Sequence, residues 1–92
     1  MIDASLQEKL RSQYNPDDSP LRTLQLQMLD ILIEFDRICK KHNIRYWLDA
    51  GTLLGAVRHG GFIPWDDDLD FFMTPDNYEK FAIKIFVEEK KI

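Results

Sequence analysis

The sequence predicts an α+β fold in which helices and short strands alternate along one small domain. The chain has 92 residues, which is enough for a single domain and too few for two. Its composition, with 45% hydrophobic and 30% charged residues, is ordinary for a globular protein. Helical hydrophobic periods alternate with β-branched and aromatic runs, and this alternation gives the order helix, strand, helix, strand, helix.

Residues 1–19 are expected to form a polar N-terminal arm ahead of a domain at residues 20–92. The apolar residues of this arm are spaced as on one face of a short helix: Ile2, Leu6 and Leu10. The run at 15–20 contains two prolines with Asn, Asp and Ser, which breaks that helix.

A long helix with a strong hydrophobic period is predicted to open the domain. Ser19 offers a capping hydroxyl, and Pro20 suits the first helical position. The apolar stripe consists of Leu21, Leu24, Met28, Ile31, Phe35 and Ile38. The residues that fall off the stripe are Arg22, Gln25, Glu34, Arg37 and Lys41. Asn43 can adopt the left-handed conformation that ends a helix.

The other elements are shorter. They are a strand at 44–49, a turn at 50–52, a short helix at 53–59 stopped by Gly60 and Gly61, a loop at 62–65, a strand at 66–73 and a helix that begins at Thr74 and Pro75. Two short strands make a marginal sheet, which needs a further strand or a packed helix. We therefore expect either the truncated, N-terminal part of a larger fold or a homo-oligomer that completes the sheet.

Charge and composition exclude several classes of protein. Sixteen acidic and twelve basic residues give a net charge of −4, whereas duplex-binding proteins carry a basic excess, so no nucleic-acid partner is expected. The single cysteine, Cys39, excludes an internal disulfide and is expected to be a buried apolar residue. No apolar run approaches the roughly 20 residues of a membrane span, and the N-terminus lacks signal-peptide features. The expected location is cytoplasmic.

An acidic segment is the strongest candidate for chemistry. On a strand, Asp66, Asp68 and Asp70 would share one face, with side chains about 6–7 Å apart. Ionised carboxylates at that spacing repel one another unless a cation lies between them, and such oxygen ligands suit Mg²⁺ or Mn²⁺. The alternative is a solvated acidic face on an edge strand, which the apolar neighbours Trp65 and Phe71 disfavour.

A calcium loop of the EF-hand type is excluded. A loop that began at Asp66 would need Gly at its sixth position and Glu at its twelfth, where this sequence has Phe71 and Asn77.

Gly51 and Thr52 form the second candidate element, between a predicted strand and a predicted helix. Glycine lets the backbone approach a phosphate, and N–H groups at a helix start attract anions. The alternative is an ordinary turn, which Asp49 is expected to cap. Beside a metal-binding strand, a phosphate-holding turn would supply the parts for transfer of a phosphoryl-linked group.

Residues 47–70 read WLDAGTLLGAVRHGGFIPWDDDLD, and this string resembles the LicD family. These are phosphocholine transferases of bacterial surface glycans, related to the fukutin-type ribitol-phosphate transferases. The likeness extends over residues 20–81. It implies a nucleotidyltransferase-like fold with a small mixed sheet. It also implies that Gly51 and Thr52 hold nucleotide phosphates.

By the same resemblance, Asp68 and Asp70 are the catalytic acid–x–acid pair that binds Mg²⁺ or Mn²⁺, and Asp66 is a further ligand or supports the ligands. Arg58 is expected either to reach the donor phosphate or to form a surface salt bridge. His59 is expected to make a loop hydrogen bond, with substrate contact as the alternative. Trp47 and Trp65 are expected in the core rather than as platforms for a base or an ammonium group.

The resemblance implies transfer of a phosphoryl-substituted alcohol, such as phosphocholine from CDP-choline, to a cell-surface glycan acceptor. Nucleotidyl transfer on the same scaffold and a non-catalytic truncated or interaction module remain as alternatives. In the nucleotidyltransferase superfamily that the resemblance implies, a third carboxylate commonly lies on a later strand. In this sequence, by contrast, the acidic residues after Asp70 all lie in a helical segment. We therefore expect the 92-residue chain to be incomplete as a catalyst on its own.

Overall fold

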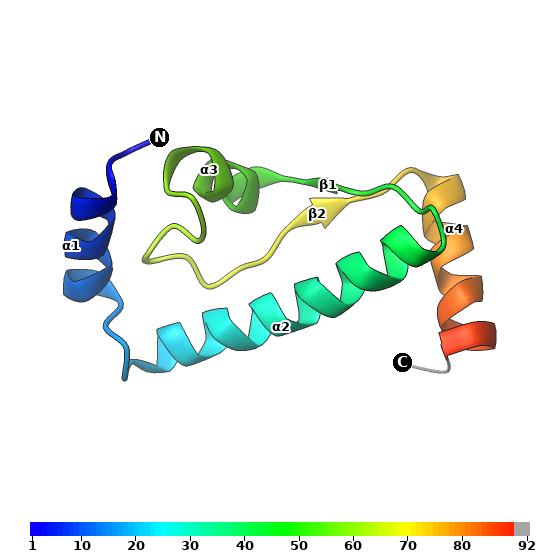
Figure 1. Ribbon diagram of the computed structural model, residues 1–92, viewed down its shortest axis with the longest axis horizontal. Coiled ribbons are helices and arrows are strands. Elements are labelled where there is room, and N and C mark those ends of the chain that lie inside the picture. The colour runs from blue at the N-terminus through cyan, green and yellow to red at the C-terminus, as the bar shows by residue number, and fades with distance from the viewer. Residues whose placement is uncertain (90–92) are drawn as a thin grey trace.

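The computed structural model describes residues 1–89, which form an α+β chain (Figure 1). The elements are α1 (Ala4–Tyr14), α2 (Pro20–Lys41), β1 (Trp47–Leu48), α3 (Ala50–Arg58), β2 (Phe71–Phe72), α4 (Pro75–Lys84) and a short π-helix, η1 (Ile85–Glu89). From α2 onward, the predicted order of helix, strand, helix, strand, helix is confirmed. Within the described part of the chain, no helix combines the length and the apolar character needed to cross a membrane.

The molecule is elongated and built on α2 (Figure 1). The long helix forms one side, α3 and the β1–β2 pair run along the opposite side, and α1 and α4 lie across the two ends. The principal extents are 44 × 25 × 17 Å, and the radius of gyration is 15.2 Å. A compact chain of this length would have a radius of gyration of about 12 Å.

Both ends of α2 follow the predicted capping chemistry. The Ser19 hydroxyl accepts a hydrogen bond from the Arg22 backbone N–H at 3.1 Å, and Pro20 occupies the first turn. Asn43 adopts φ 56°, the left-handed conformation predicted for it. The next residue, Ile44, donates its backbone N–H to the Cys39 carbonyl at 2.8 Å, which closes the helix end.

The sheet is smaller than the sequence predicted. Trp47 pairs with Phe72 and Leu48 with Phe71, in an antiparallel register. The prediction of a strand over 66–73 is wrong for its first half, because the backbone turns at Asp66, whose N–H donates to the Ile63 carbonyl at 2.9 Å. In residues 1–89 the sheet is antiparallel rather than mixed, so the nucleotidyltransferase-like core stays a prediction.

Helix α3 begins three residues earlier than predicted. The residues assigned to a turn at 50–52 form its first turn, and Ala50 enters it with φ 48°. Gly60 has φ +68°, which confirms the predicted stop and is a conformation that glycine adopts without strain.

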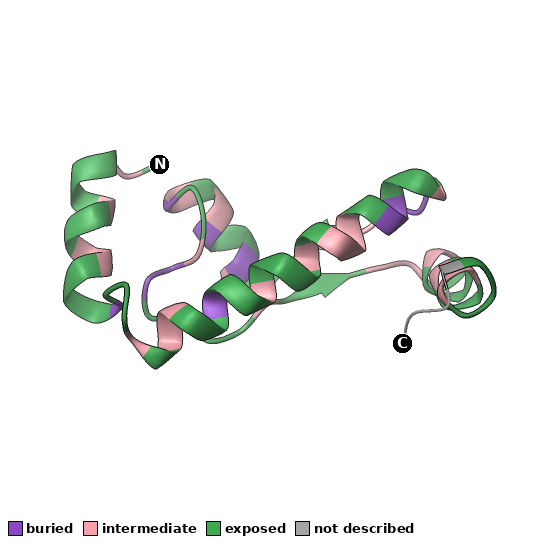
Figure 2. Ribbon diagram, turned by 60° about the horizontal axis from the view of Figure 1, so that its bottom comes forward, coloured by how far each residue is buried: buried purple, intermediate pink, exposed green. Residues whose placement is uncertain are grey.

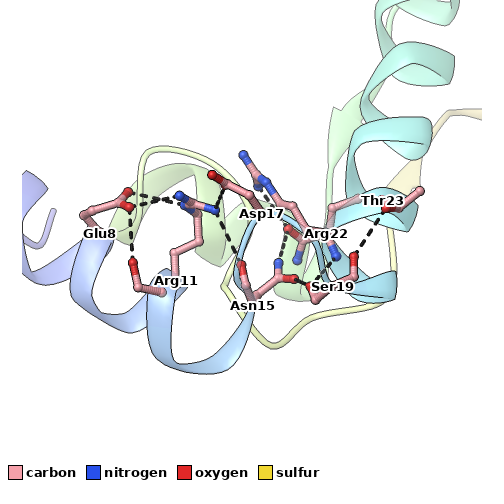
Figure 3. Close-up of polar contacts among 9 residues, drawn as sticks. Glu8, Arg11, Asn15, Asp17, Ser19, Arg22 and Thr23 are labelled. Atoms are coloured by element: carbon pink, nitrogen blue, oxygen red, sulfur yellow. Dashed lines mark hydrogen bonds and ion pairs between the residues drawn. The ribbon is translucent and has the colours of Figure 1, made fainter.

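The first helix, α1, lies within the segment expected as an N-terminal arm, where the spacing of Ile2, Leu6 and Leu10 suits a helix face, and it packs against the end of α3. The Ile2 backbone N–H donates to the Arg58 carbonyl at 2.7 Å, and the Gln7 side chain contacts His59. Figure 3 shows the corner between α1 and α2, where Arg11 forms ion pairs with Glu8 and Asp17.

The core is thin and divided along α2 (Figure 2). Phe35 lies at its aromatic centre, with ring centroids 4.6 to 4.8 Å from those of Tyr46, Phe71 and Phe81. The buried apolar residues are Ile38, Cys39, Ile44 and Ile63. Burial raises the pKa of the Cys39 thiol to about 11, which agrees with its predicted role as an apolar residue.

The predicted stripe on α2 is only partly buried. Ile38 is buried as expected, but Leu24 and Ile31 are exposed. Conversely, Gln25 was assigned to the polar face and is completely buried. The stripe prediction fails at these positions because hydrogen bonds of Gln25, described below, draw this part of α2 toward the loop at 63–66.

Candidate functional site

The predicted phosphate-holding turn and the acidic segment lie side by side. The Asp70 backbone N–H donates to the Thr52 hydroxyl at 2.7 Å, and the Asp49 backbone N–H donates to the Asp70 carbonyl at 3.0 Å. These two hydrogen bonds attach the segment after Asp66 to the first turn of α3. The Thr52 side chain is buried in this contact.

Gly51 contacts the acidic segment directly. A Cβ atom at this position would lie 2.6 Å from Asp66 Oδ2, closer than non-bonded atoms approach. The missing side chain therefore leaves room for a carboxylate. The sequence analysis assigned the glycine to a close approach by phosphate, and it did not predict this contact with Asp66.

Three consecutive carboxylates form the acidic cluster: Asp66, Asp67 and Asp68, each with an oxygen within 4.8 Å of the others. The prediction that Asp66, Asp68 and Asp70 share one face of a strand is wrong, because residues 66–70 do not form a strand. Asp66 Oδ1 accepts a hydrogen bond from the Asp68 backbone N–H at 3.3 Å, which holds the turn. Asp70 lies outside the cluster, attached through its backbone to Thr52.

The charges in the cluster act on one another. Asp68 is exposed, and the negative charge of Asp67 is the main cause that raises its pKa; desolvation and the charges of Asp70 and Asp66 add to this effect. A divalent cation would offset such repulsion, and carboxylate oxygens are the ligands that Mg²⁺ and Mn²⁺ prefer. The residues present therefore fit a hard divalent cation.

Asp49 is the N-cap residue of α3 by its backbone, since its carbonyl accepts from the Leu53 N–H at 3.1 Å. Its side chain makes no capping hydrogen bond, so the prediction that this carboxylate caps the turn is wrong.

Arg58 and His59 lie at the opposite end of α3 from Gly51. The Arg58 Nε–H donates to His59 Nε2 at 2.8 Å, so His59 carries its proton on Nδ1 and donates it to Gln7 Oε1 at 2.6 Å. Burial lowers the pKa of His59, and the charge of Arg58 lowers it further. The neutral ring joins α1 to α3, which is the loop hydrogen bond expected for it.

Each tryptophan packs on one side and is open on the other. Trp65 is 52% exposed and meets the Tyr14 ring edge-on, with centroids 5.6 Å apart. Trp47 is 42% exposed and stacks on Phe72 at 5.3 Å. The expectation that both belong to the core is therefore wrong, because both side chains are exposed and each contacts only neighbouring rings.

A cavity of about 350 Å³ lies beside the turn. Its wall is apolar for the most part and includes Leu29 of α2, Leu48 of β1 and Leu69 of the acidic segment, with Thr52 on one side. The hydroxyl that binds Asp70 thus lies between the acidic segment and an apolar space.

Gln25 is the residue of this region that sequence reasoning missed. Its side-chain amide contacts the backbone of residues 63–66, immediately before the rest of the acidic cluster. One signal could have indicated burial: Gln25 lies one turn after Leu21 and one turn before Leu29, so it interrupts an apolar row of the helix.

The comparisons with known proteins decide the family. A family model described as "LicD/FKTN/FKRP, nucleotidyltransferase domain" matches residues 43–92. This chain belongs to the LicD family. The resemblance noted in the sequence is thereby confirmed.

Named relatives agree with this assignment. The chain is 50% identical over 68 residues to the lipopolysaccharide cholinephosphotransferase LicD of Haemophilus influenzae, in a match that covers 74% of this chain and 26% of that protein. It is 67% identical over 27 residues to the human ribitol 5-phosphate transferase FKRP, covering 29% and 6% of the two chains. An uncharacterized protein of Rickettsia prowazekii is 51% identical over 45 residues, which are 49% of this chain and 17% of that protein.

The chain thus spans about a quarter of the length of the Haemophilus relative. No solved structure matches it.

Proposed function

We propose that this LicD-family chain supplies the donor-binding and metal-binding part of a phosphotransferase. The reaction is the transfer of a phosphoryl-substituted alcohol, such as phosphocholine from CDP-choline, to a cell-surface glycan. The observation that carries the proposal is the contact between the turn at Gly51 and Thr52 and the acidic segment, in a chain that is 50% identical over 68 residues to a lipopolysaccharide cholinephosphotransferase.

The proposed metal ligands are those of the sequence analysis: Asp66, Asp68 and Asp70. Asp66 and Asp68 lie in the acidic cluster with Asp67, and Asp70, outside the cluster, is near enough for its charge to act on Asp68. Mg²⁺ or Mn²⁺ bound there would neutralise charge on the donor phosphates. The chain contributes by holding the Asp66 carboxylate against Gly51 and by fixing the Asp70 backbone on Thr52.

The proposed phosphate contacts are Gly51, Thr52 and Arg58. The first N–H groups of α3 are unpaired within the helix and can bind an anion. The Thr52 oxygen accepts from Asp70, which leaves its own O–H as a donor to a phosphate oxygen. Arg58 lies about 9 Å farther along the helix, and its contact with His59 uses Nε alone, so its terminal nitrogens suit a more distant phosphate or alcohol group of the donor.

Positioning and charge stabilisation account for most catalysis of phosphoryl transfer, so the proposal requires no nucleophilic side chain on the protein. The glycan acceptor supplies the attacking oxygen, and the nucleotide leaves. The group that is transferred distinguishes this reaction from nucleotidyl transfer. Nucleotidyl transfer would release pyrophosphate from CTP and leave a nucleoside monophosphate on the acceptor.

The first test is calorimetric titration of CDP-choline, with CTP as the comparator, into the folded chain with and without Mn²⁺. We expect Mn²⁺-dependent binding that favours CDP-choline. Asp68→Asn and Asp70→Asn are expected to weaken Mn²⁺ binding by about tenfold or more. Asp18→Asn, which removes an exposed carboxylate between α1 and α2, is the matched control.

Equal Mn²⁺ binding by the parent, Asp68→Asn and Asp70→Asn would contradict the assigned ligands. Tighter metal-dependent binding of CTP than of CDP-choline would favour nucleotidyl transfer. A folded parent that binds neither metal nor nucleotide would support a non-catalytic role for this chain.

A further inference from the structure

We infer that Gln25 is a positioning residue for the acidic cluster: its buried side-chain amide fixes the backbone of residues 63–66 and thereby places the Asp66 carboxylate against Gly51. The effect of Gln25 on metal binding rests on the proposed function, since the acidic cluster is the proposed metal site. Its geometry stands on contacts that hold whether or not a metal binds.

The amide nitrogen of Gln25 donates hydrogen bonds to three carbonyl groups of one short loop. Its Nε2 lies 3.2 Å from the Ile63 oxygen, 3.4 Å from the Pro64 oxygen and 2.8 Å from the Asp66 oxygen. Ile63 and Pro64 are buried, and buried carbonyls need a hydrogen-bond partner. Gln25, itself fully buried, is such a partner from another element, α2, and it shares the Ile63 carbonyl with the Asp66 N–H.

The opposite side of the same amide is also occupied. Gln25 Oε1 accepts from Asn15 Nδ2 at 2.8 Å and from an Arg22 terminal nitrogen at 3.2 Å. The Asn15 Oδ1 in turn accepts from the Ser19 hydroxyl at 2.6 Å. Figure 3 shows Asn15, Ser19 and Arg22 gathered at the corner where α1 meets α2.

These partners allow one orientation of the Gln25 amide. Donors lie on one side of it and carbonyl acceptors on the other. A flipped amide would set its NH₂ against the donors of Asn15 and Arg22 and its oxygen against the loop carbonyls. Both contacts would leave buried polar groups unpaired, which is costly.

The backbone of Asp66 is therefore held at both of its polar groups. Its carbonyl accepts from Gln25, and its N–H donates to the Ile63 carbonyl, which also accepts from Gln25. A shift of this backbone moves the carboxylate away from Gly51 and changes the distances within the cluster. Gln25 thus acts on the site through Asp66.

The test separates the two sides of the network. Gln25→Met removes the amide and keeps an unbranched chain of similar length. Gln25→Glu keeps the oxygen that accepts from Asn15 and Arg22 but replaces the amide nitrogen. Asn15→Leu is the matched control, because it breaks the same buried network on the α1 side, while the remaining Arg22 donor still orients the Gln25 amide toward the loop.

Two readouts are measured on the full chain. Hydrogen–deuterium exchange of the backbone amides of Ile63 and of residues 65–68, without metal, is expected to speed up in both Gln25 variants relative to exchange in α2. Mn²⁺ affinity is expected to fall by about tenfold, as for other residues that orient metal ligands. Asn15→Leu is expected to lower the melting temperature while both readouts stay near those of the parent.

The inference is overturned if exchange at 63–68 is unchanged in the Gln25 variants, or if Asn15→Leu changes it as much. If Gln25→Met does not fold, Gln25→Glu gives the same comparison with half of the network retained. A parent chain that binds no Mn²⁺ would refute the proposed function, and the exchange data would still decide the role of Gln25.

Discussion

At the scale of single residues, the site depends on how closely Gly51 approaches Asp66. The atom that a side chain at position 51 would meet is the far end of a flexible carboxylate. A larger residue there can be accommodated by rotation of Asp66, without movement of the backbone. Position 51 therefore controls the geometry of the acidic cluster more than it controls the fold.

We predict that Gly51→Ala weakens Mn²⁺ binding by about tenfold and changes the melting temperature little, because the added methyl group displaces the Asp66 carboxylate. Gly61→Ala is the control, since a Cβ at Gly61 meets no atom within 4 Å. Calorimetric titration and thermal melts of both variants check this. Unchanged metal affinity in a folded Gly51→Ala would show that Asp66 is not a ligand.

The second prediction at this scale concerns Asp68 and pH. The folded chain raises the pKa of Asp68 above its ordinary value of 3.8, chiefly through the charge of Asp67. The folded state thus binds this proton more tightly than the unfolded state, so the carboxyl favours folding below pH 3.8, and that benefit is lost as the pH rises through the raised pKa.

Asp68→Asn is accordingly expected to be more stable than the parent at neutral pH without metal, and the difference should disappear in acid. Thermal melts of both proteins at neutral pH and below pH 3.8 measure it. A parent that is more stable than Asp68→Asn at neutral pH, with the difference lost in acid, would mean that the ionised Asp68 has a stabilising partner in the folded chain.

At the scale of elements, α3 must lie close to the loop that follows it. A Cβ at Gly55 would lie 2.5 Å from the Gly61 carbonyl oxygen and 3.0 Å from the Ile63 nitrogen. Both are backbone atoms, which cannot rotate away. Gly55 therefore fixes the distance between α3 and the start of the loop that Gln25 binds.

We predict that Gly55→Ala destabilises the chain by about 1–3 kcal/mol, the usual cost of forcing extra volume into a packed contact. Urea unfolding measures this, with Gly61→Ala again as the control. A folded Gly55→Ala with the stability of the parent would mean that α3 and the loop can separate freely.

The elements differ in how well the sequence predicted them. The limits of α2 and the stop at Gly60 follow from local capping chemistry, which the residues themselves carry. The conformation of the acidic segment does not follow from local chemistry. Alternation in the sequence predicts a strand, whereas contacts with Gln25 turn the backbone at Asp66. The site residues Gly51, Thr52 and Asp70 were predicted to lie near one another and do, but the contact of Gly51 with Asp66 depends on tertiary geometry.

At the scale of the whole molecule, much of α2 is in contact with solvent (Figure 2). Ile31 is 67% exposed and Ile33 is 59% exposed. The predicted apolar stripe includes Ile31, and in this chain both isoleucines contribute little buried area. Their side chains should therefore add little to the stability of the isolated chain.

We predict that Ile31→Gln and Ile33→Gln each change the free energy of unfolding by less than about 0.5 kcal/mol, as is usual for surface positions. Urea unfolding at several protein concentrations measures this, and Ile38→Ala, at a buried position of the same helix, is the contrasting variant. A larger loss that grows with protein concentration would show that another copy of the chain covers this face.

The contact between Gln25 and Asp66 joins residues 41 positions apart. Closing a loop of that length costs about 3 kcal/mol of chain entropy from its length alone, whereas a helix such as α2 can form within about a microsecond from local contacts. The acidic segment should thus reach its place late in folding, after the transition state. In stopped-flow kinetics followed by tryptophan fluorescence, Gln25→Met is then expected to accelerate unfolding and leave the refolding rate nearly unchanged.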